Sequence, residues 1–171
     1  TIYDWGRVVK NIKKARINNI FVNFASAGAA FYSGKHLPYK HCEDSLQSLI
    51  RIAHKEGIRV HAKILTFFLH FAPEAQINKM KKEKRLLINT RGKIVYQSKT
   101  PWLDPALPEN RELMLNVIWE IVKKFDIDGI QLDYVRFFEE TGVPEAIMSI
   151  RRMIVTNFVS EVSQMMRQLD P

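Results

Sequence analysis

A carboxylate ends an otherwise apolar segment in the second half of the chain. In "GIQLDYVRF", residues 129–137, Asp133 closes a run of β-favouring residues, with Gln131 before it and Tyr134 and Arg136 after it. A carboxylate at the C-terminal end of a parallel strand is placed to act as an acid, a base or a nucleophile. The pattern therefore predicts that Asp133 is catalytic. An ion-paired structural acid, or a cap for the following loop, is the alternative.

Two earlier apolar segments carry polar residues with the same alternation. Asn23 interrupts "NIFVNFA", residues 19–25, and His61 and Lys63 interrupt "IRVHAKIL", residues 58–65. Successive side chains of a strand point to opposite faces, so each segment has one apolar face and one face with polar residues. A sheet covered on both faces would be apolar on both, whereas the inner face of a (β/α)8 barrel opens into the active site. Partly solvated edge strands are the alternative. We expect one inward-facing cluster: Asn23, His61, Lys63, Gln131 and Asp133.

Asp128 stands at the other end of the segment that Asp133 closes. In folds built from parallel strands and helices, the N-terminal ends of the strands contribute to stability rather than to catalysis. The position of Asp128 therefore predicts a turn or capping role.

Helical patterns separate these strands. The periodicity predicts helices over 4–18, 43–57, 107–125 and from Pro144 onward, alternating with strands at about 19–25, 58–66 and 128–135. Such alternation indicates parallel strands joined by right-handed crossovers. By itself it fits either a doubly wound sheet or a (β/α)8 barrel.

A long insertion follows the second strand, at about 67–103. It is predicted to hold a short helix near 73–83 and a hairpin, "LLINTRGKIVYQ", that turns at Arg91 and Gly92. Its segment "TPWLDP" places Trp102 just before the next helix. Trp102 is a candidate for stacking on a sugar ring, and a tryptophan that covers the core is the alternative. Tyr32, in the loop after the first strand, is a further candidate for substrate binding.

Composition narrows the class of protein. The 171 residues, with 46% hydrophobic and 26% charged residues, suit a single globular domain, 1–171. No apolar run approaches the roughly 18 residues that span a bilayer, so no membrane span is predicted. The net charge of +8 leaves an anion- or nucleic-acid-binding domain as an alternative. However, the basic residues are spread over helical segments and RNA-binding aromatic signatures are missing, so no nucleic-acid partner is predicted.

Several common sites have no motif in this sequence. His36, His41 and Cys42 lie close together, but their spacing matches no common zinc pattern, so no metal is predicted. The sequence lacks the glycine-rich fingerprints of nucleotide binding and the G-x-S-x-G elbow of serine hydrolases. No cofactor is therefore predicted.

Three stretches together resemble a known family. The tract "AHKEGIRVHAKI", the loop "WLDPALPENRE" and the strand "DGIQLDYVRF" are similar to the glycosyl-hydrolase-like TIM-barrel proteins, once catalogued as a domain of unknown function. The resemblance runs from about Ile17 to Phe137. It implies a (β/α)8 barrel that acts on glycosidic bonds of polysaccharides, cell-wall glycans among them. It also implies an exported protein, periplasmic or extracellular.

The resemblance also assigns residues. Asp133 matches the acid that ends the fourth strand, and His61 matches the histidine of the third strand. The chain departs from the family at Lys63, where an aromatic residue is usual, and at Phe138, which replaces a proline. The substrate-binding residues are predicted to be Asn23, Tyr32, His61, Lys63, Trp102, Gln131, Tyr134 and Arg136.

A complete barrel has eight strands and about 250 residues. The chain is therefore expected to cover roughly half a barrel, from the first helix to the fourth. If it were a whole protein, its open edges would favour self-association.

The function predicted is hydrolysis of a polysaccharide by a carboxylate pair. Glu139 and Glu140 are the local candidates for the second acid, and a later strand outside the chain is the other source. The 171 residues alone are therefore expected to be inactive. A noncatalytic carbohydrate-binding barrel is the alternative.

Overall fold

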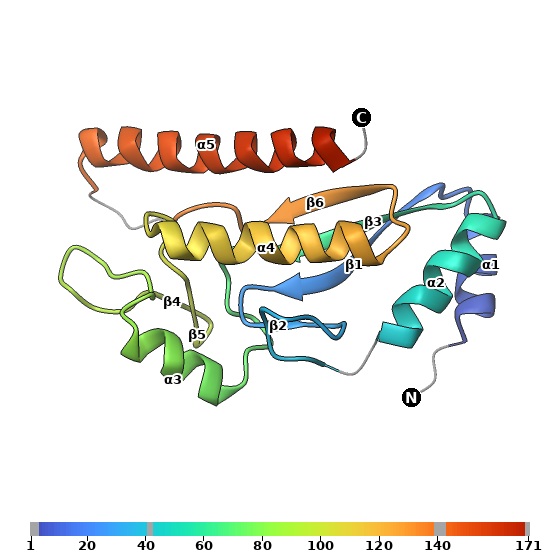
Figure 1. Cartoon of the computed structure of the whole chain (residues 1–171), viewed down its shortest axis with the longest axis horizontal. Helices are drawn as coiled ribbons and strands as arrows, with labels where there is room; N and C mark the ends of the chain where they lie inside the picture. Colours follow the sequence, from blue (N-terminus) through green and yellow to red (C-terminus); the bar gives the residue numbers. More distant parts are fainter. Residues whose placement is uncertain (1–3, 41–42, 139–142, 170–171) are drawn as a thin grey trace.

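A computed structural model of the chain describes residues 4–40, 43–138 and 143–169. His41, Cys42, Glu139 and Glu140 lie outside the described residues. Helices and strands alternate along the chain (Figure 1) in the order α1 Trp5–Lys14, β1 Asn19–Ser26, β2 Ala29–Ala30, α2 Glu43–Lys55, β3 Arg59–Leu65, α3 Glu74–Lys82, β4 Tyr96–Gln97, β5 Thr100–Pro101, α4 Pro108–Lys124, β6 Gly129–Asp133 and α5 Glu145–Leu169.

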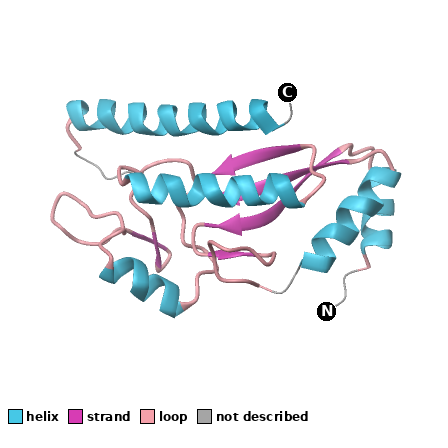
Figure 2. Ribbon diagram, viewed as in Figure 1, coloured by secondary structure: helices cyan, strands magenta, loops and turns pink. Residues whose placement is uncertain are grey.

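The main sheet has the strand order β2-β1-β3-β6. β1, β3 and β6 are parallel neighbours, and the two residues of β2 return antiparallel to the end of β1. Figure 2 shows these strands together, with the helices that connect them placed around the sheet. The predicted α/β class with parallel strands and alternating helices is confirmed, and each of the three predicted strands lies within two residues of its expected bounds at either end.

The helix ends follow their local sequence. Asp4 caps α1 by accepting a hydrogen bond from the backbone N–H of Arg7 at 3.0 Å. The helix was predicted to reach residue 18 but ends at Lys14, because Arg16 adopts a φ of 58° and reverses the chain. α4 begins at Pro108, which suits a first turn, and carries Glu109 there and lysines in its last turn.

One face of the sheet packs on the helices. Val60, Ala62 and Ile64 of β3 have no exposed surface and belong to a single apolar core that includes residues of α1, α2, α4 and α5. On β1, Phe24 meets Phe125 edge to face at 5.1 Å. The helices therefore cover the face of the sheet that carries the apolar side chains. The alternate residues of each strand point to the opposite face.

The insertion lies beyond the C-terminal ends of the parallel strands, on the side toward which the arrows of β1 and β6 point (Figure 1). Its predicted helix is α3, and the predicted hairpin forms a bridge between Ile88 and Ile94 with a turn that contains Gly92. The short β4–β5 pair was not predicted. Trp102 joins the insertion to the core, since its carbonyl accepts from the backbone N–H of Leu87.

No helix in the described part of the chain is long and apolar enough to cross a membrane.

Candidate functional site

Polar side chains form rows across the face of the sheet opposite the helices. Asn23 of β1 pairs in register with Lys63 of β3, which in turn pairs with Gln131 of β6. Two residues earlier along the strands, and so on the same face, His61 pairs with Gly129. Side chains at equivalent register positions of neighbouring strands share a face, so the structure brings the predicted inward-facing residues together.

Asp133 lies at the C-terminal end of β6 and is held through both carboxylate oxygens. Its Oδ2 is 2.7 Å from Nζ of Lys63, and its Oδ1 accepts the backbone N–H of Tyr134 at 2.8 Å. About a third of each side chain is exposed, 34% for Asp133 and 31% for Lys63. Both oxygens of Asp133 therefore accept from a donor, and these two contacts fix the orientation of the carboxylate.

A hollow of about 420 Å³ opens beside this carboxylate, lined by residues 132–136. Within β1, β3 and β6, all of which lie in the described part of the chain, Asp133 is the one carboxylate. The two acids proposed as local partners, Glu139 and Glu140, are outside the described residues. These strands therefore supply one carboxylate with space beside it.

His61 and Phe21 form a flat layer on the same face. The rings stack with centroids 4.9 Å apart, and His61 Nε2 is hydrogen bonded to Oδ1 of Asn19 at 2.9 Å. The histidine ring lies against Gly129, where a Cβ atom would be 2.7 Å from Nδ1, so a side chain there would displace the ring. Phe21 is 56% exposed. The sequence reasoning did not select Phe21, although its parity matches that of Asn23 and marks it as inward-facing.

Tyr134 leaves the strand alternation. Its backbone has a φ of 53°, a conformation that few residues other than glycine adopt, and its ring stacks on Phe68 at 4.7 Å. Trp102 packs in the same aromatic cluster and has no exposed surface. In this chain it therefore matches the alternative of a tryptophan that covers the core. The guanidinium of Arg136, whose residue is exposed, lies 5.6 Å from the Trp102 ring centroid.

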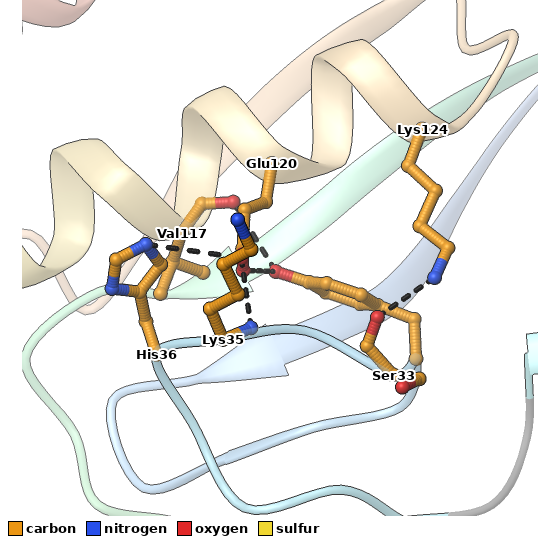
Figure 3. A network of polar contacts seen from close by, with 7 residues as sticks. Ser33, Lys35, His36, Val117, Glu120 and Lys124 are labelled. Atoms are coloured by element: carbon orange, nitrogen blue, oxygen red, sulfur yellow. Dashed lines mark hydrogen bonds and ion pairs between the residues drawn. The ribbon is translucent and has the colours of Figure 1, made fainter.

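Tyr32 lies away from the polar face and is fully buried against α4. Its hydroxyl donates to Oε2 of Glu120 and to the carbonyl of Val117, each at 3.3 Å. Burial, and then Glu120, raise the pKa of Tyr32. The backbone N–H of Lys35 donates to the same carboxylate at 2.8 Å, so Glu120 pins the loop after β2 onto α4 (Figure 3). The structure thus does not bring Tyr32 together with the other predicted site residues.

Asp128 holds the opposite end of β6. Its Oδ2 accepts the backbone N–H of Val60 at 2.7 Å and contacts His54 Nε2 at 2.8 Å. Desolvation acts to raise the pKa of Asp128, but the Val60 N–H and His54 outweigh it and lower that pKa. These bonds join α2, β3 and β6, as the predicted structural role requires.

Among the described residues no group of three histidine, cysteine or acidic side chains is arranged to hold a metal ion. His41 and Cys42, two of the three residues weighed as metal ligands, are outside that part of the chain.

Comparison with protein families places the chain among glycosyl-hydrolase-like proteins. The model of the family described as "Glycosyl hydrolase-like 10" matches residues 5–166. The protein "Glycosyl hydrolase DigH" of Escherichia coli strain K12 is 25% identical over 154 residues, covering 77% of this chain and 34% of that protein. The chain thus spans about a third of the length of this curated relative.

Solved structures share the fold. A hypothetical protein from Ruminiclostridium thermocellum superposes with a TM-score of 0.70 at 19% identity, covering 94% of this chain and 85% of that one. Alpha-L-fucosidase isoenzyme 2 from Paenibacillus thiaminolyticus gives a TM-score of 0.65 at 16% identity, covering 98% of this chain and 27% of the fucosidase. The maltogenic alpha-amylase AmyB from Thermotoga neapolitana gives 0.61 at 15% identity, covering 97% and 38%. The chain therefore has the fold of part of a TIM-barrel glycosidase.

Proposed function

Because the chain belongs to the Glycosyl hydrolase-like 10 family, we propose that it contributes one of the two catalytic carboxylates of a glycoside hydrolase, Asp133. The observation that carries this proposal is the geometry of that carboxylate. It stands at the C-terminal end of a parallel strand, faces the polar side of the sheet beside a hollow, and is held by Lys63 and the Tyr134 N–H. Active sites of barrels are built at this end of the strands.

The partners of Asp133 favour one catalytic role over the other. Glycoside hydrolysis uses a protonated acid, which gives its proton to the leaving oxygen, and an ionised carboxylate, which attacks the sugar or activates water. Both oxygens of Asp133 already accept from donors, the Lys63 ammonium at 2.7 Å and the Tyr134 N–H, so neither oxygen is placed to donate a proton. We therefore assign Asp133 the ionised role.

In the retaining form of the reaction, an Asp133 oxygen bonds to the anomeric carbon as the glycosidic C–O bond breaks. The second acid protonates the leaving oxygen, and water then releases the sugar from Asp133. In the inverting form, Asp133 instead takes a proton from the attacking water. The second acid is assigned to a carboxylate outside the 171 residues, with Glu139 and Glu140 as the local alternatives.

The substrate proposed is a polysaccharide, with cell-wall glycans among the candidates. Asn23 and Gln131 offer amide groups for sugar hydroxyls, and the exposed Phe21 ring offers an apolar surface for a sugar face. These residues share the face that carries Asp133. They lie at paired strand positions nearer the N-terminal ends of the strands than Asp133 does. Asn23 and Gln131, one layer of strand pairing before Asp133, are nearer to the carboxylate than Phe21 is.

Carbohydrate binding without hydrolysis is the second candidate. The observation that favours it is that β1, β3 and β6 together hold a single carboxylate, and this one is already ion-paired with Lys63. Hydrolysis and binding separate in one experiment. The native protein that carries these residues is incubated with peptidoglycan strands and common glucans, and released products are identified by mass spectrometry.

Hydrolysis is expected in the native protein, and its loss in Asp133→Asn with substrate binding retained would support the proposal. Binding of a glycan without any product would leave the binding role in its place. The 171 residues alone are expected to bind weakly and to release no product, because they lack a second acid on the three parallel strands. Turnover by these residues alone would contradict the assignment of the second acid to a carboxylate outside them.

A further inference from the structure

A second cavity lies between the segment that follows β6 and one side of α5. Its volume is about 280 Å³, and three of the residues that line it are arginines, Arg136, Arg151 and Arg152. The remaining lining is apolar except for Thr156. Arg151 and Arg152 were not among the residues selected from the sequence. Three guanidinium groups around one small cavity make it a candidate site for an anion.

Two of these guanidinium groups lie over aromatic rings. Cζ of Arg151 is 4.9 Å from the centroid of Phe137, and Cζ of Arg136 is 5.6 Å from that of Trp102 and 5.8 Å from that of Phe138. A ring beneath the planar group engages its face. The N–H donors lie on the edges of the group, in the fork that matches a carboxylate or phosphate.

Among the described residues, the guanidinium groups of Arg136 and Arg151 have no carboxylate at ion-pair distance. Arg152 is ion-paired with Glu145. Burial raises the pKa of Asp104, and the backbone N–H of Ala106, Arg151 and Arg111 act against that rise. Even so, in the described part of the chain no carboxylate oxygen lies within 4.0 Å of the guanidinium nitrogens of Arg136 or Arg151. Within the described residues, the cavity therefore offers two guanidinium groups that are not in an ion pair.

We infer that this cavity binds a carboxylate or phosphate group carried by the sugar chain on which Asp133 acts. The inference rests on the proposed function and narrows its substrate class to acidic polysaccharides. Arg136 connects the two places, because it lines both this cavity and the hollow beside Asp133. An acidic sugar bound by Arg136 and Arg151 would direct the neighbouring part of the chain toward the carboxylate.

The test compares two sugars that differ in one carboxylate. Isothermal titration calorimetry with D-glucuronate and D-glucose is expected to show binding of glucuronate alone, weakened by added salt. Arg151→Gln is expected to weaken glucuronate binding about tenfold, the loss of one charge-assisted hydrogen bond. Arg151→Lys keeps the charge without the fork of N–H donors, and its affinity for glucuronate should lie between those of the wild type and Arg151→Gln. Arg167→Gln removes the same charge from the same helix, where Arg167 bonds Ser163, and should bind like the wild type.

Several outcomes would overturn the inference. Equal affinity for glucuronate and glucose would show that the cavity does not bind the anionic group. Unchanged affinity for glucuronate in both Arg151→Gln and Arg136→Gln would show the same. The second variant serves if the first fails to fold, which thermal melting followed by circular dichroism would reveal. Tighter binding of inorganic phosphate than of glucuronate or glucose 6-phosphate would point to a free ion and overturn the assignment to a sugar chain.

Measuring both glucuronate binding and glycan hydrolysis separates this inference from the proposed function. Asp133→Asn is expected to abolish hydrolysis and to leave glucuronate binding unchanged. Arg151→Gln is expected to lower kcat/KM for an acidic glycan and not for a neutral one. Arginine-dependent glucuronate binding in a protein that hydrolyses no glycan would refute the hydrolase while supporting the anion site.

Discussion

The two ends of β6 each hold an aspartate with a cationic or protonatable partner and a backbone N–H donor, yet the two arrangements differ in what they connect. Asp128 bonds the N–H of Val60 on the neighbouring strand and the side chain of His54 on α2. Asp133 bonds the N–H of the next residue in its own segment and the side chain of Lys63. The exposed fractions of the two carboxylate side chains are similar, 29% and 34%.

Exposure therefore does not distinguish the structural acid from the candidate catalytic one. The difference lies in the partners. The Asp128 carboxylate joins three elements and would loosen them if removed, whereas the Asp133 carboxylate contacts only a side chain of another strand, that of Lys63. A carboxylate that holds little of the fold in place is free to meet a substrate.

The sharpest test of this contrast is the same substitution at both ends of the strand. In the native protein, Asp133→Asn is expected to lower kcat by roughly 10²- to 10⁴-fold, the usual contribution of a positioned catalytic group. Asp128→Asn keeps a hydrogen-bond acceptor and should change kcat by less than about threefold. Rates on the preferred glycan measure both. Equal losses in the two variants would erase the distinction between the two ends.

A smaller effect on activity is expected from Lys63→Met. Loss of the ion partner should lower kcat about tenfold, since one charge-assisted contact to the reacting carboxylate is removed. The free energy of unfolding should change by no more than about 1 kcal/mol, because the pair is partly exposed. Kinetics and urea denaturation on the same samples would measure the effect on kcat and the effect on unfolding free energy separately. A large fall in stability with full activity would make Lys63 structural instead.

The stability contribution of the opposite end is measured by Asp128→Ala. Loss of the acceptor for the Val60 N–H should reduce the free energy of unfolding by about 1 kcal/mol. Asp128→Asn is the control, since an amide oxygen can still accept that bond, and it should lose less. Asp133→Ala should cost less stability than Asp128→Ala in the same urea titrations, and the reverse order would contradict the comparison.

The smallest effect concerns pH. Because the pKa of Asp128 is lower in the folded chain than its ordinary value of 3.8, its contribution is present above that value and is lost as pH falls through the folded pKa. The difference in unfolding free energy between the wild type and Asp128→Ala should therefore shrink as pH falls from about 5 to about 2. Urea titrations at several pH values would follow it. A constant gap would show that the carboxyl is not coupled to folding.

The strands and their inner face were predictable from the sequence because alternation along a strand depends only on local geometry. Asn23, Lys63 and Gln131 meet in register as the parity requires. The aromatic residues were not predictable in the same way. Whether Trp102 stacks on a sugar or on Phe68 is decided by packing of the insertion, and Tyr32 is buried by a loop that Glu120 holds onto α4.

The conformation of Tyr134 also escaped prediction. The strand was predicted to reach about residue 135, but a φ of 53° at Tyr134 turns the chain immediately after Asp133. Residues other than glycine seldom adopt this conformation, so no local pattern announces it. The two-residue strands β2, β4 and β5 escaped for a related reason, because two residues are too few to show an alternation.

The left-handed turn at Tyr134 bears on how such a protein changes over evolutionary time. The ring of Tyr134 contacts Phe68 and Trp102, which lie at the two ends of the insertion, while its N–H orients Asp133. Substitutions in the insertion that repack those rings would therefore shift the carboxylate without altering any strand. Insertions are the segments in which homologous proteins diverge most readily. A lineage of such proteins thus has a route to new substrate preferences that leaves the strand bearing Asp133 untouched.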